Sequence, residues 1–394
     1  MERSELSYIA QEYGTPAFVF DLGAFQQRLR AAQDIVGEGI GLCYAIKANP
    51  FLIPAAVEAA GKLEVCSPGE LDICEALGVD PAAIVFSGVN KTPASVHDAV
   101  EYGVGVLTAE SLKHAALIEA EGAARGEVLD VLLRLNAGSQ FGMSREDLVS
   151  IVDRREDYPH LNIVGIHYFV GTQRLNLKHQ RKELGKIEAF IDELRDEHGF
   201  AVQRLEYGPG LGVPLFVGDD FADTLAPLRE LEPDLRAIAE RVQLTIEMGR
   251  FFATECGTYL TSINDLKANK GVNYCIVDGG INHLTYIGQL MGMKVPVIDN
   301  LTALDRAASG PVDEWCICGS LCTTNDVLCR GAELDDAREG DVLAFSNCGA
   351  YSVTEGVHLF LSRTMPRIIV RHADGSFALA RDFTETSPLN TPNY

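Results

Sequence analysis

The chain has 394 residues, of which 47% are hydrophobic and 23% charged, so a large buried core is expected and disorder is not. Its formal net charge of −23 argues against nucleic-acid binding and against attraction to anionic membranes, because both depend on clustered cationic side chains. We find no apolar run of the roughly 18 residues that a membrane span needs. The length predicts more than one domain, since domains average about 150 residues.

Eight short apolar runs alternate with helix-like amphipathic stretches up to about residue 250. Near-continuous hydrophobic strands that alternate with helices are typical of a parallel sheet buried on both faces. Eight such units favour an α/β fold with a closed (β/α)₈ TIM barrel, and we assign residues 20–250 to it. The runs are Leu42–Lys47, Leu63–Ser67, Ile84–Gly88, Gly103–Ala109, Val131–Ala137, Asn162–Val170, Arg204–Gly208 and Gln243–Gly249.

The pattern changes after about residue 250, where helical stretches become rare and β-like runs dominate. Turn residues separate these runs, which indicates a C-terminal antiparallel β domain. We assign residues 1–19 and 251–394 to this domain. The runs are Gly257–Asp265, Tyr274–Gly280, Glu314–Ser320, Asp341–Asn347, Arg367–His372 and Phe377–Asp382.

The ten cysteines do not suggest a disulfide framework, because the chain is long and its opening residues, MERSELSYIAQEYG, lack the apolar stretch of a secretion signal. We therefore expect reduced thiols and a cytoplasmic location. Cys316 and Cys318 form only a C-x-C pair, without a second pair or a nearby histidine, so we expect no metal site.

Lys47 stands at the end of the first predicted barrel strand, and such strand ends build the active sites of barrels. A charged amine is costly to bury there, so it should be neutralised, paired or used. One interpretation is a desolvated amine that forms a Schiff base with an aldehyde cofactor. The other is a lysine that merely extends to solvent from the strand end.

The ends of the seventh and eighth strands carry a second group of candidates. YGPGLGVP contains Gly208, Gly210 and Gly212, which allow backbone N–H groups to approach an anion closely. EMGR supplies Glu247, Gly249 and Arg250, and barrels commonly bind phosphate at these two loops. With the lysine, the set meets the needs of pyridoxal phosphate (PLP): an imine-forming amine, a phosphate cradle and a partner for the ring nitrogen.

These motifs resemble those of the fold-type-III PLP-dependent decarboxylases, the family of diaminopimelate, ornithine and arginine decarboxylases. The matching segments are colinear and cover most of the chain. The resemblance implies an alanine racemase-like barrel followed by a β domain, in agreement with the strand pattern. The segments are Tyr44–Pro50, Glu64–Leu71, Arg134–Met143, Ile166–Gln173, Tyr207–Pro214, Glu247–Ala253, Cys318–Leu328 and Cys348–Val353.

The resemblance implies that Lys47 holds the cofactor as a Schiff base, that Glu247 pairs with the pyridine nitrogen, and that Arg134 lies near the cofactor. A carboxylate keeps that nitrogen protonated, which makes the ring a better electron sink. Alanine racemases have an arginine in this role, so Glu247 favours decarboxylation over racemisation. The implied phosphate-binding residues are Thr172, Gly208, Gly210, Gly212, Gly249, Arg250 and Tyr351.

Cys322 matches the cysteine that a neighbouring subunit contributes to the family's active site, where it protonates the carbon after CO₂ leaves. The resemblance therefore implies a homodimer with shared active sites. Asp326 matches an acid near the substrate, although an ordinary turn residue is an equal alternative.

The chain departs from the family pattern at two places. Phe169 replaces the histidine that stacks on the cofactor ring; it can still stack, but it carries no charge or hydrogen bond. His167 matches the first histidine of that motif and could equally be a satisfied core residue. Thr323 stands where relatives have an acid that faces the distal ammonium of the substrate, so a substrate with a neutral far end is expected.

The sequence therefore predicts α-decarboxylation of an amino acid, either diaminopimelate-like or an acidic amino acid tethered through a carrier protein or an amide. The motifs are similar to those of the decarboxylase that acts on carrier-tethered glutamate in butirosin biosynthesis. The alternatives are a PLP-dependent racemase or epimerase and a non-catalytic PLP-binding protein. The second alternative conflicts with the additional C-terminal domain, because such proteins are single barrels.

Overall fold

The computed structural model describes residues 1–306 and 310–393, which form two compact units. The barrel unit comprises Gln26–Val213 and Asp223–Phe252. The β unit comprises Met1–Phe25, Pro214–Ala222 and the described chain from Ala253 onward. Residues 20–25 and 214–222 group with the β unit, whereas the sequence analysis assigned them to the barrel domain.

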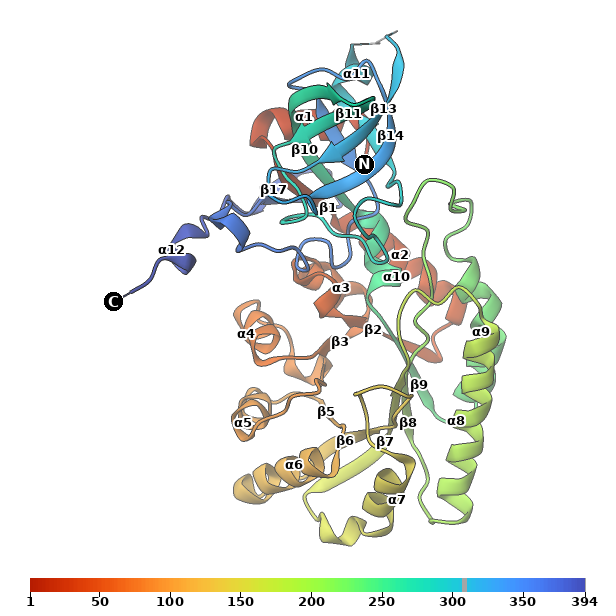
Figure 1. Cartoon of the computed structure of the whole chain (residues 1–394). Helices are drawn as coiled ribbons and strands as arrows, with labels where there is room; N and C mark the ends of the chain where they lie inside the picture. The colour runs from red at the N-terminus through yellow and green to blue at the C-terminus, as the bar shows by residue number, and fades with distance from the viewer. Residues whose placement is uncertain (307–309, 394) are drawn as a thin grey trace. The chain divides into compact units, whose positions relative to one another are not determined.

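The barrel unit contains a closed barrel of eight parallel strands, which lies entirely within described residues and confirms the predicted fold (Figure 1). All eight apolar runs form its strands. In barrel order these are β2 (Ile40–Ala45), β3 (Gly61–Val65), β4 (Ile84–Phe86), β5 (Val106–Ala109), β6 (Leu129–Arg134), β7 (Leu161–Phe169), β8 (Arg204–Gly208) and β9 (Gln243–Met248). A buried cluster of Val85, Val106, Leu132 and Val164 joins the four adjacent strands β4 to β7.

Helices connect the strands, and side-chain caps fix where several of them begin. Ser67, Thr92 and Ser111 each accept a hydrogen bond from a backbone N–H three residues later, which satisfies a donor that the first helical turn leaves open. The helices are α2 (Leu22–Val36), α3 (Ile53–Ala59), α4 (Pro68–Ala76), α5 (Pro93–Tyr102), α6 (Leu112–Arg125), α7 (Arg145–Asp153), α8 (Lys178–Asp196), α9 (Ala226–Ala239) and α10 (Arg250–Ala253).

The β unit is built on a mixed sheet that has nine strands among the described residues. Its main order is β14-β13-β11-β10-β1-β16-β17, and β15 pairs with β10 and with β12. Most pairs are antiparallel, as predicted, but β1 with β16 and β11 with β13 are parallel. The strands are β1 (Ala17–Asp21), β10 (Gly257–Asn269), β11 (Val272–Val277), β12 (Ile298–Asn300), β13 (Val312–Cys318), β14 (Val327–Asp335), β15 (Val342–Phe345), β16 (Arg367–Arg371) and β17 (Phe377–Arg381).

Three further helices belong to the β unit: α1 (Arg3–Tyr13), α11 (Leu301–Asp305) and α12 (Ser387–Asn390). Leu6 and Ile9 of α1 pack in one core cluster with Val19, Leu260 and Ile369 of the sheet. The first helix is thereby fixed against strands from both ends of the chain. No helix in residues 1–306 or 310–393 is long and apolar enough to cross a membrane.

Candidate active site

Polar residues occupy inward positions of the barrel, where branched apolar side chains usually fill the core. Arg134 on β6 is paired in register with His167 on β7, and His167 with Glu206 on β8. Residues in register on neighbouring strands point to the same face of a sheet, so these three side chains share one layer. All three are buried, as is Glu247 on β9. A fold that buries this many ionisable groups together needs a functional explanation.

Lys47 lies in the 3₁₀ turn Ile46–Ala48, two residues beyond the end of β2, so the prediction that it closes the strand is wrong. This turn has no side-chain cap and ends where the Asn49 N–H donates to Ile46 O. Asn49 then caps the next turn, Pro50–Leu52, by accepting a hydrogen bond from the Phe51 N–H. Lys47 remains one-third exposed. Lys47 Nζ lies 2.5 Å from Glu64 Oε2 and 3.7 Å from Glu247 Oε1, so the amine stands between two carboxylates and still reaches solvent.

Glu247 is held by His167, whose Nε2 lies 2.9 Å from Glu247 Oε2. Burial, followed by the nearby Arg134 charge, lowers the pKa of His167 to about 3. The imidazole is therefore neutral, and its Nε2–H donates to the carboxylate. This contact fixes one oxygen of Glu247 and leaves the other, Oε1, directed toward Lys47.

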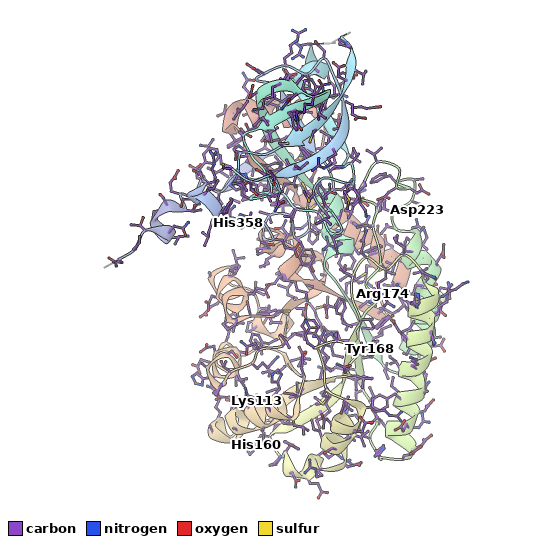
Figure 2. The ribbon with its side chains drawn as sticks, in the orientation of Figure 1. Lys113, His160, Tyr168, Arg174, Asp223 and His358 are labelled. Atoms are coloured by element: carbon purple, nitrogen blue, oxygen red, sulfur yellow. The ribbon has the colours of Figure 1, made fainter. Side chains whose placement is uncertain are left out.

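The loops that follow β7 and β8 are tied together by hydrogen bonds. The Arg174 N–H donates to Gly210 O at 2.9 Å, and the Gln173 side chain exchanges hydrogen bonds with the Val213 backbone. Arg174 also forms an ion pair with Glu183 on α8 (Arg174 is labelled in Figure 2). The loops predicted to bind phosphate are therefore held in place by hydrogen bonds and an ion pair.

The glycines of this cradle permit close packing that no other residue would allow. A Cβ on Gly210 would lie 1.7 Å from Gly171 O, and one on Gly208 would lie 2.2 Å from the Phe169 ring. Gly210 also has φ +60°. In the next loop, a Cβ on Gly249 would meet Ala48 at 2.8 Å, so this loop packs directly against the turn that carries Lys47.

The remaining predicted residues of the barrel unit differ in their surroundings. Arg134 donates to Glu110 Oε1 at 3.0 Å and lies over the Phe141 ring. The Phe169 ring centroid is 5.9 Å from Lys47 Nζ. Thr172 is exposed and Arg250 is buried.

In the β unit, Cys322 and Thr323 lie between β13 and β14, with Cys322 exposed. Asp326 is buried, and its two carboxylate oxygens accept hydrogen bonds from the backbone N–H groups of Ile281 and Leu321. These contacts hold two loops together, and they support a structural role for Asp326. Tyr351 is half-buried and has φ +66°, the left-handed region that few tyrosines adopt.

Sequence reasoning missed three buried acids, Glu64, Glu110 and Glu206. Each stands in or directly after a barrel strand, and Glu64 and Glu206 are isolated carboxylates inside otherwise apolar runs. An acid within a strand that is buried on both faces is the signal that could have identified them. One polar side-chain atom each of His167, Glu206 and Glu247 lies within 4.8 Å of the other two, so these groups form a single buried cluster.

The described geometry defines a barrel enzyme with a tethered amine, an opposed carboxylate and an anion cradle. A family model, described as the pyridoxal-binding domain of pyridoxal-dependent decarboxylases, matches residues 22–254. This match covers more than half of the chain, and the chain therefore belongs to that family.

Individual relatives agree with this membership. Diaminopimelate decarboxylase of Pseudomonas aeruginosa is 29% identical over 88% of this chain and 85% of its own length. The L-glutamyl-[BtrI acyl-carrier protein] decarboxylase of Niallia circulans is 25% identical over 97% of this chain and 94% of its own. The solved diaminopimelate decarboxylase of M. jannaschii, in co-complex with L-lysine, has the same fold, with a TM-score of 0.85 and 23% identity over 97% of this chain and 92% of that one.

The comparisons confirm the predicted family, the predicted α-decarboxylation of an amino acid and the predicted PLP cofactor. The residues of the barrel unit fit that cofactor. Lys47 is an amine within reach of solvent, Glu247 keeps one oxygen free beside it, and the braced glycine loops have the small residues that an approaching phosphate needs.

Proposed function

We propose that this PLP-dependent decarboxylase removes the α-carboxylate of an amino acid whose far end carries no charge, and that Lys47, Glu247 and Cys322 are its catalytic residues. The position of Lys47 between Glu64 and Glu247 carries the catalytic part of the proposal. The neutral Thr323 carries the part that concerns the substrate.

In this proposal Lys47 binds the aldehyde carbon of the cofactor, and Glu247 faces the ring nitrogen with the oxygen that His167 leaves free. The cofactor supplies the electron sink for the bond that breaks. Arg134, His167 and Phe169 would hold the ring. Seven residues would hold the phosphate group: Thr172, Gly208, Gly210, Gly212, Gly249, Arg250 and Tyr351. The hydrogen bonds that hold these loops support this assignment. Because the backbone N–H groups are already ordered, anion binding costs them little conformational entropy.

Cys322 of the partner subunit donates the proton that replaces CO₂, so the protein is a homodimer with shared active sites. Mixed dimers test this part. Lys47→Ala and Cys322→Ala proteins, unfolded and refolded together, should regain about a quarter of the wild-type activity, since half of the dimers are mixed and each has one intact site. Mixtures that stay as inactive as the separate variants would exclude shared sites.

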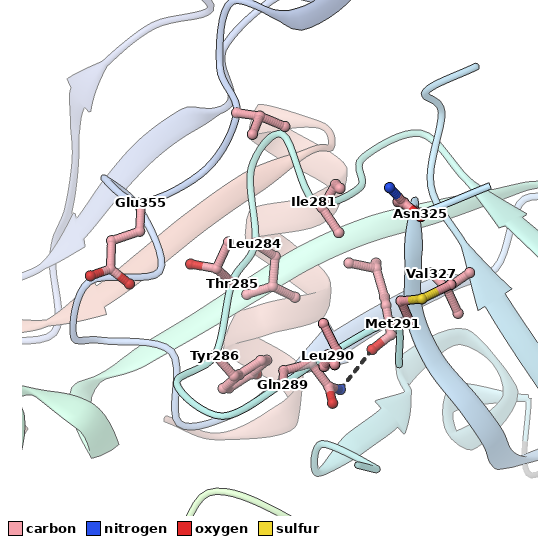
Figure 3. Close-up of a pocket in the computed structure, with 12 residues that line it drawn as sticks. Ile281, Leu284, Thr285, Tyr286, Gln289, Leu290, Met291, Asn325, Val327 and Glu355 are labelled. Atoms are coloured by element: carbon pink, nitrogen blue, oxygen red, sulfur yellow. Dashed lines mark hydrogen bonds between the residues drawn. The ribbon is translucent and has the colours of Figure 1, made fainter. Parts of the chain in front are cut away.

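The far end of the substrate is neutral because Thr323 offers no counter-charge, and an unpaired ammonium is costly to desolvate. A cavity of about 350 Å³ in the β unit lies beside the same loop (Figure 3). Leucine, valine and isoleucine side chains line it together with hydroxyl and amide groups, and of the described lining residues only Glu355 is charged. Such a surface suits an uncharged chain with amide groups, including an amino acid tethered to an acyl carrier protein.

Release of CO₂ from a panel of free, amidated and carrier-tethered amino acids tests the function. We expect a neutral-ended glutamyl derivative to react faster than free diaminopimelate or free glutamate. Faster reaction of diaminopimelate would overturn the substrate assignment, and substrate loss without CO₂ would overturn decarboxylation.

All ten cysteines are free thiols, which supports the proposed location in the reducing cytoplasm.

A further inference from the structure

Glu206 is a buried acid that none of the roles above uses. Its side chain points into the barrel from β8, is 2% exposed, and has register partners His167 on β7 and Thr245 on β9. Among the described residues, Glu206 Oε1 has no hydrogen-bond partner. If this carboxylate were ionised, its Oε1 would lack both water and a donor, which is unfavourable for a buried charge.

The groups around Glu206 add negative charge to this site. Carboxylates approach it from two strands, Glu247 on β9 and Glu64 on β3. Two cations also act on Glu206, Lys62 on β3 and Lys47, and Lys47 is already paired with Glu64. The titratable groups that face it from every neighbouring element are His167, Glu247, Cys43 on β2, Lys62 and Glu64 on β3, and Lys47 after β2.

Two acids this close do not both ionise in a buried site, so one of them holds a proton. Glu247 accepts a hydrogen bond from His167 and has the Lys47 amine at 3.7 Å. Glu206 receives neither. Burial, followed by the charges of Glu247 and Glu64, raises the pKa of Glu206 to about 8.

We propose that Glu206 is a positioning residue that stays protonated and thereby leaves the negative charge of the barrel core on Glu247. It acts through Glu247 and not on the substrate. The inference rests on the proposed role of Glu247 toward the ring nitrogen, because a proton on Glu247 would remove the anion that keeps that nitrogen cationic.

The proposal predicts a specific dependence of stability on pH. The pKa of Glu206 is about 8 in the folded protein and near the ordinary 4.5 in the unfolded chain. The unfolded chain therefore releases this proton first as the pH rises, and the folded state loses stability between about pH 4.5 and pH 8. Glu206→Gln has the same shape without an ionisable proton, so it escapes this loss.

The experiment compares Glu206→Gln with wild type and with Glu240→Gln, an exposed acid of the barrel unit. We expect the melting temperature of Glu206→Gln to exceed that of wild type by a margin that grows by several degrees between about pH 5 and pH 8. The Glu240→Gln margin should not change with pH. A pH-independent margin for Glu206→Gln would overturn the proposal. This measurement uses the full chain with and without cofactor, so it is independent of whether Glu247→Gln impairs catalysis.

Activity and spectroscopy supply the other readouts. The ratio of kcat in Glu206→Gln to kcat in wild type should rise from near one at about pH 7 to several-fold at about pH 9, where wild-type Glu206 ionises beside Glu247. Infrared spectra of the wild-type protein should show a protonated carboxyl band at neutral pH that disappears through about pH 8. Absence of that band in wild type would refute the inference even if Glu206→Gln does not fold.

Discussion

Lys47 Nζ and Glu64 Oε2 lie 2.5 Å apart, the shortest of the contacts described for this amine. Glu64 is on β3, one strand along the barrel from the turn that holds Lys47, and it is almost fully buried. Glu64 therefore both orients the amine and stands ready to exchange a proton with it.

Glu64→Gln keeps the shape of this contact and removes its charge. We expect kcat to fall about 100-fold, because the amide cannot accept a proton from Lys47. The free energy of unfolding should change little. Glu70→Gln is the matched control, since Glu70 lies nearby but accepts its hydrogen bond from the Cys66 N–H. Equal kcat values in the two variants would exclude a role for Glu64 in proton exchange.

Glu247→Gln should bind the cofactor with near-normal affinity but lower kcat by about 100-fold or more, because a neutral amide cannot keep the ring nitrogen cationic. Cofactor titration by absorbance and steady-state kinetics separate these two effects. An unchanged kcat would contradict the assigned role. His167 should still contact the side chain at this position, because an amide oxygen also accepts its Nε2–H.

Gly210→Ala should weaken cofactor binding and destabilise the barrel unit by at least about 3 kcal/mol, because the added Cβ would overlap Gly171 O. Gly199→Ala is the control. Gly199 has φ +59°, nearly the +60° of Gly210, but an added Cβ would meet no atom within 4 Å. Its loss should be limited to the backbone strain of about 1–2 kcal/mol. Denaturant unfolding measures the free energy of unfolding of both variants. An equal decrease in the two would show that the loop around Gly210 is not tightly packed.

Thr323→Glu places an acid at the position that we propose to face the far end of the substrate. We expect kcat/KM for diaminopimelate to rise about tenfold and kcat/KM for a neutral-ended substrate to fall, since the new carboxylate favours a distal ammonium. Thr324→Glu adds the same charge one residue away at an exposed position and should change neither value. If both variants respond alike, residue 323 does not select the substrate.

Three buried histidines should make the protein sensitive to mild acid. Burial lowers the pKa of His167 to about 3 and those of His114 and His283 to about 4. Folded pKa values below the ordinary 6.5 mean that the unfolded chain binds protons first as the pH falls. The contribution of each histidine to stability is therefore complete above about pH 6.5 and declines toward pH 4.5 by about 1.4 kcal/mol per pH unit, with a sign opposite to that of Glu206. Melting curves across this range measure the decline, and His283→Gln should reduce its slope.

The sequence pattern predicted the architecture well because strand alternation is a local property. Each of the eight apolar runs became a barrel strand. The position of Lys47 beyond its strand was not predicted, because the turn Ile46–Ala48 has no side-chain cap and ends on a backbone hydrogen bond from the Asn49 N–H to Ile46 O, which leaves no signal in the sequence. Parallel pairing of β1 with β16 was missed for another reason, since it joins residues about 350 positions apart and leaves no local signal.

The candidate site was predicted from motifs, and motifs name residues one at a time. Glu64 and Glu206 can be recognised as site residues only when the fold places them beside Lys47 and His167. The direction of the Asp326 side chain, toward two backbone N–H groups, likewise depends on how two distant loops meet. Such contacts between distant residues arise only in the folded chain, so no single sequence segment predicts them.

The order of the β sheet has a consequence for biosynthesis. β1 pairs on one side with β10 and on the other with β16, so β1 is synthesised before the barrel and both of its partner strands after it. The whole barrel emerges from the ribosome in the interval. The nascent chain must therefore keep Ala17–Asp21 from pairing elsewhere until Arg367–Arg371 arrives, and deleting the first two dozen residues would remove an inner strand instead of a dispensable tail.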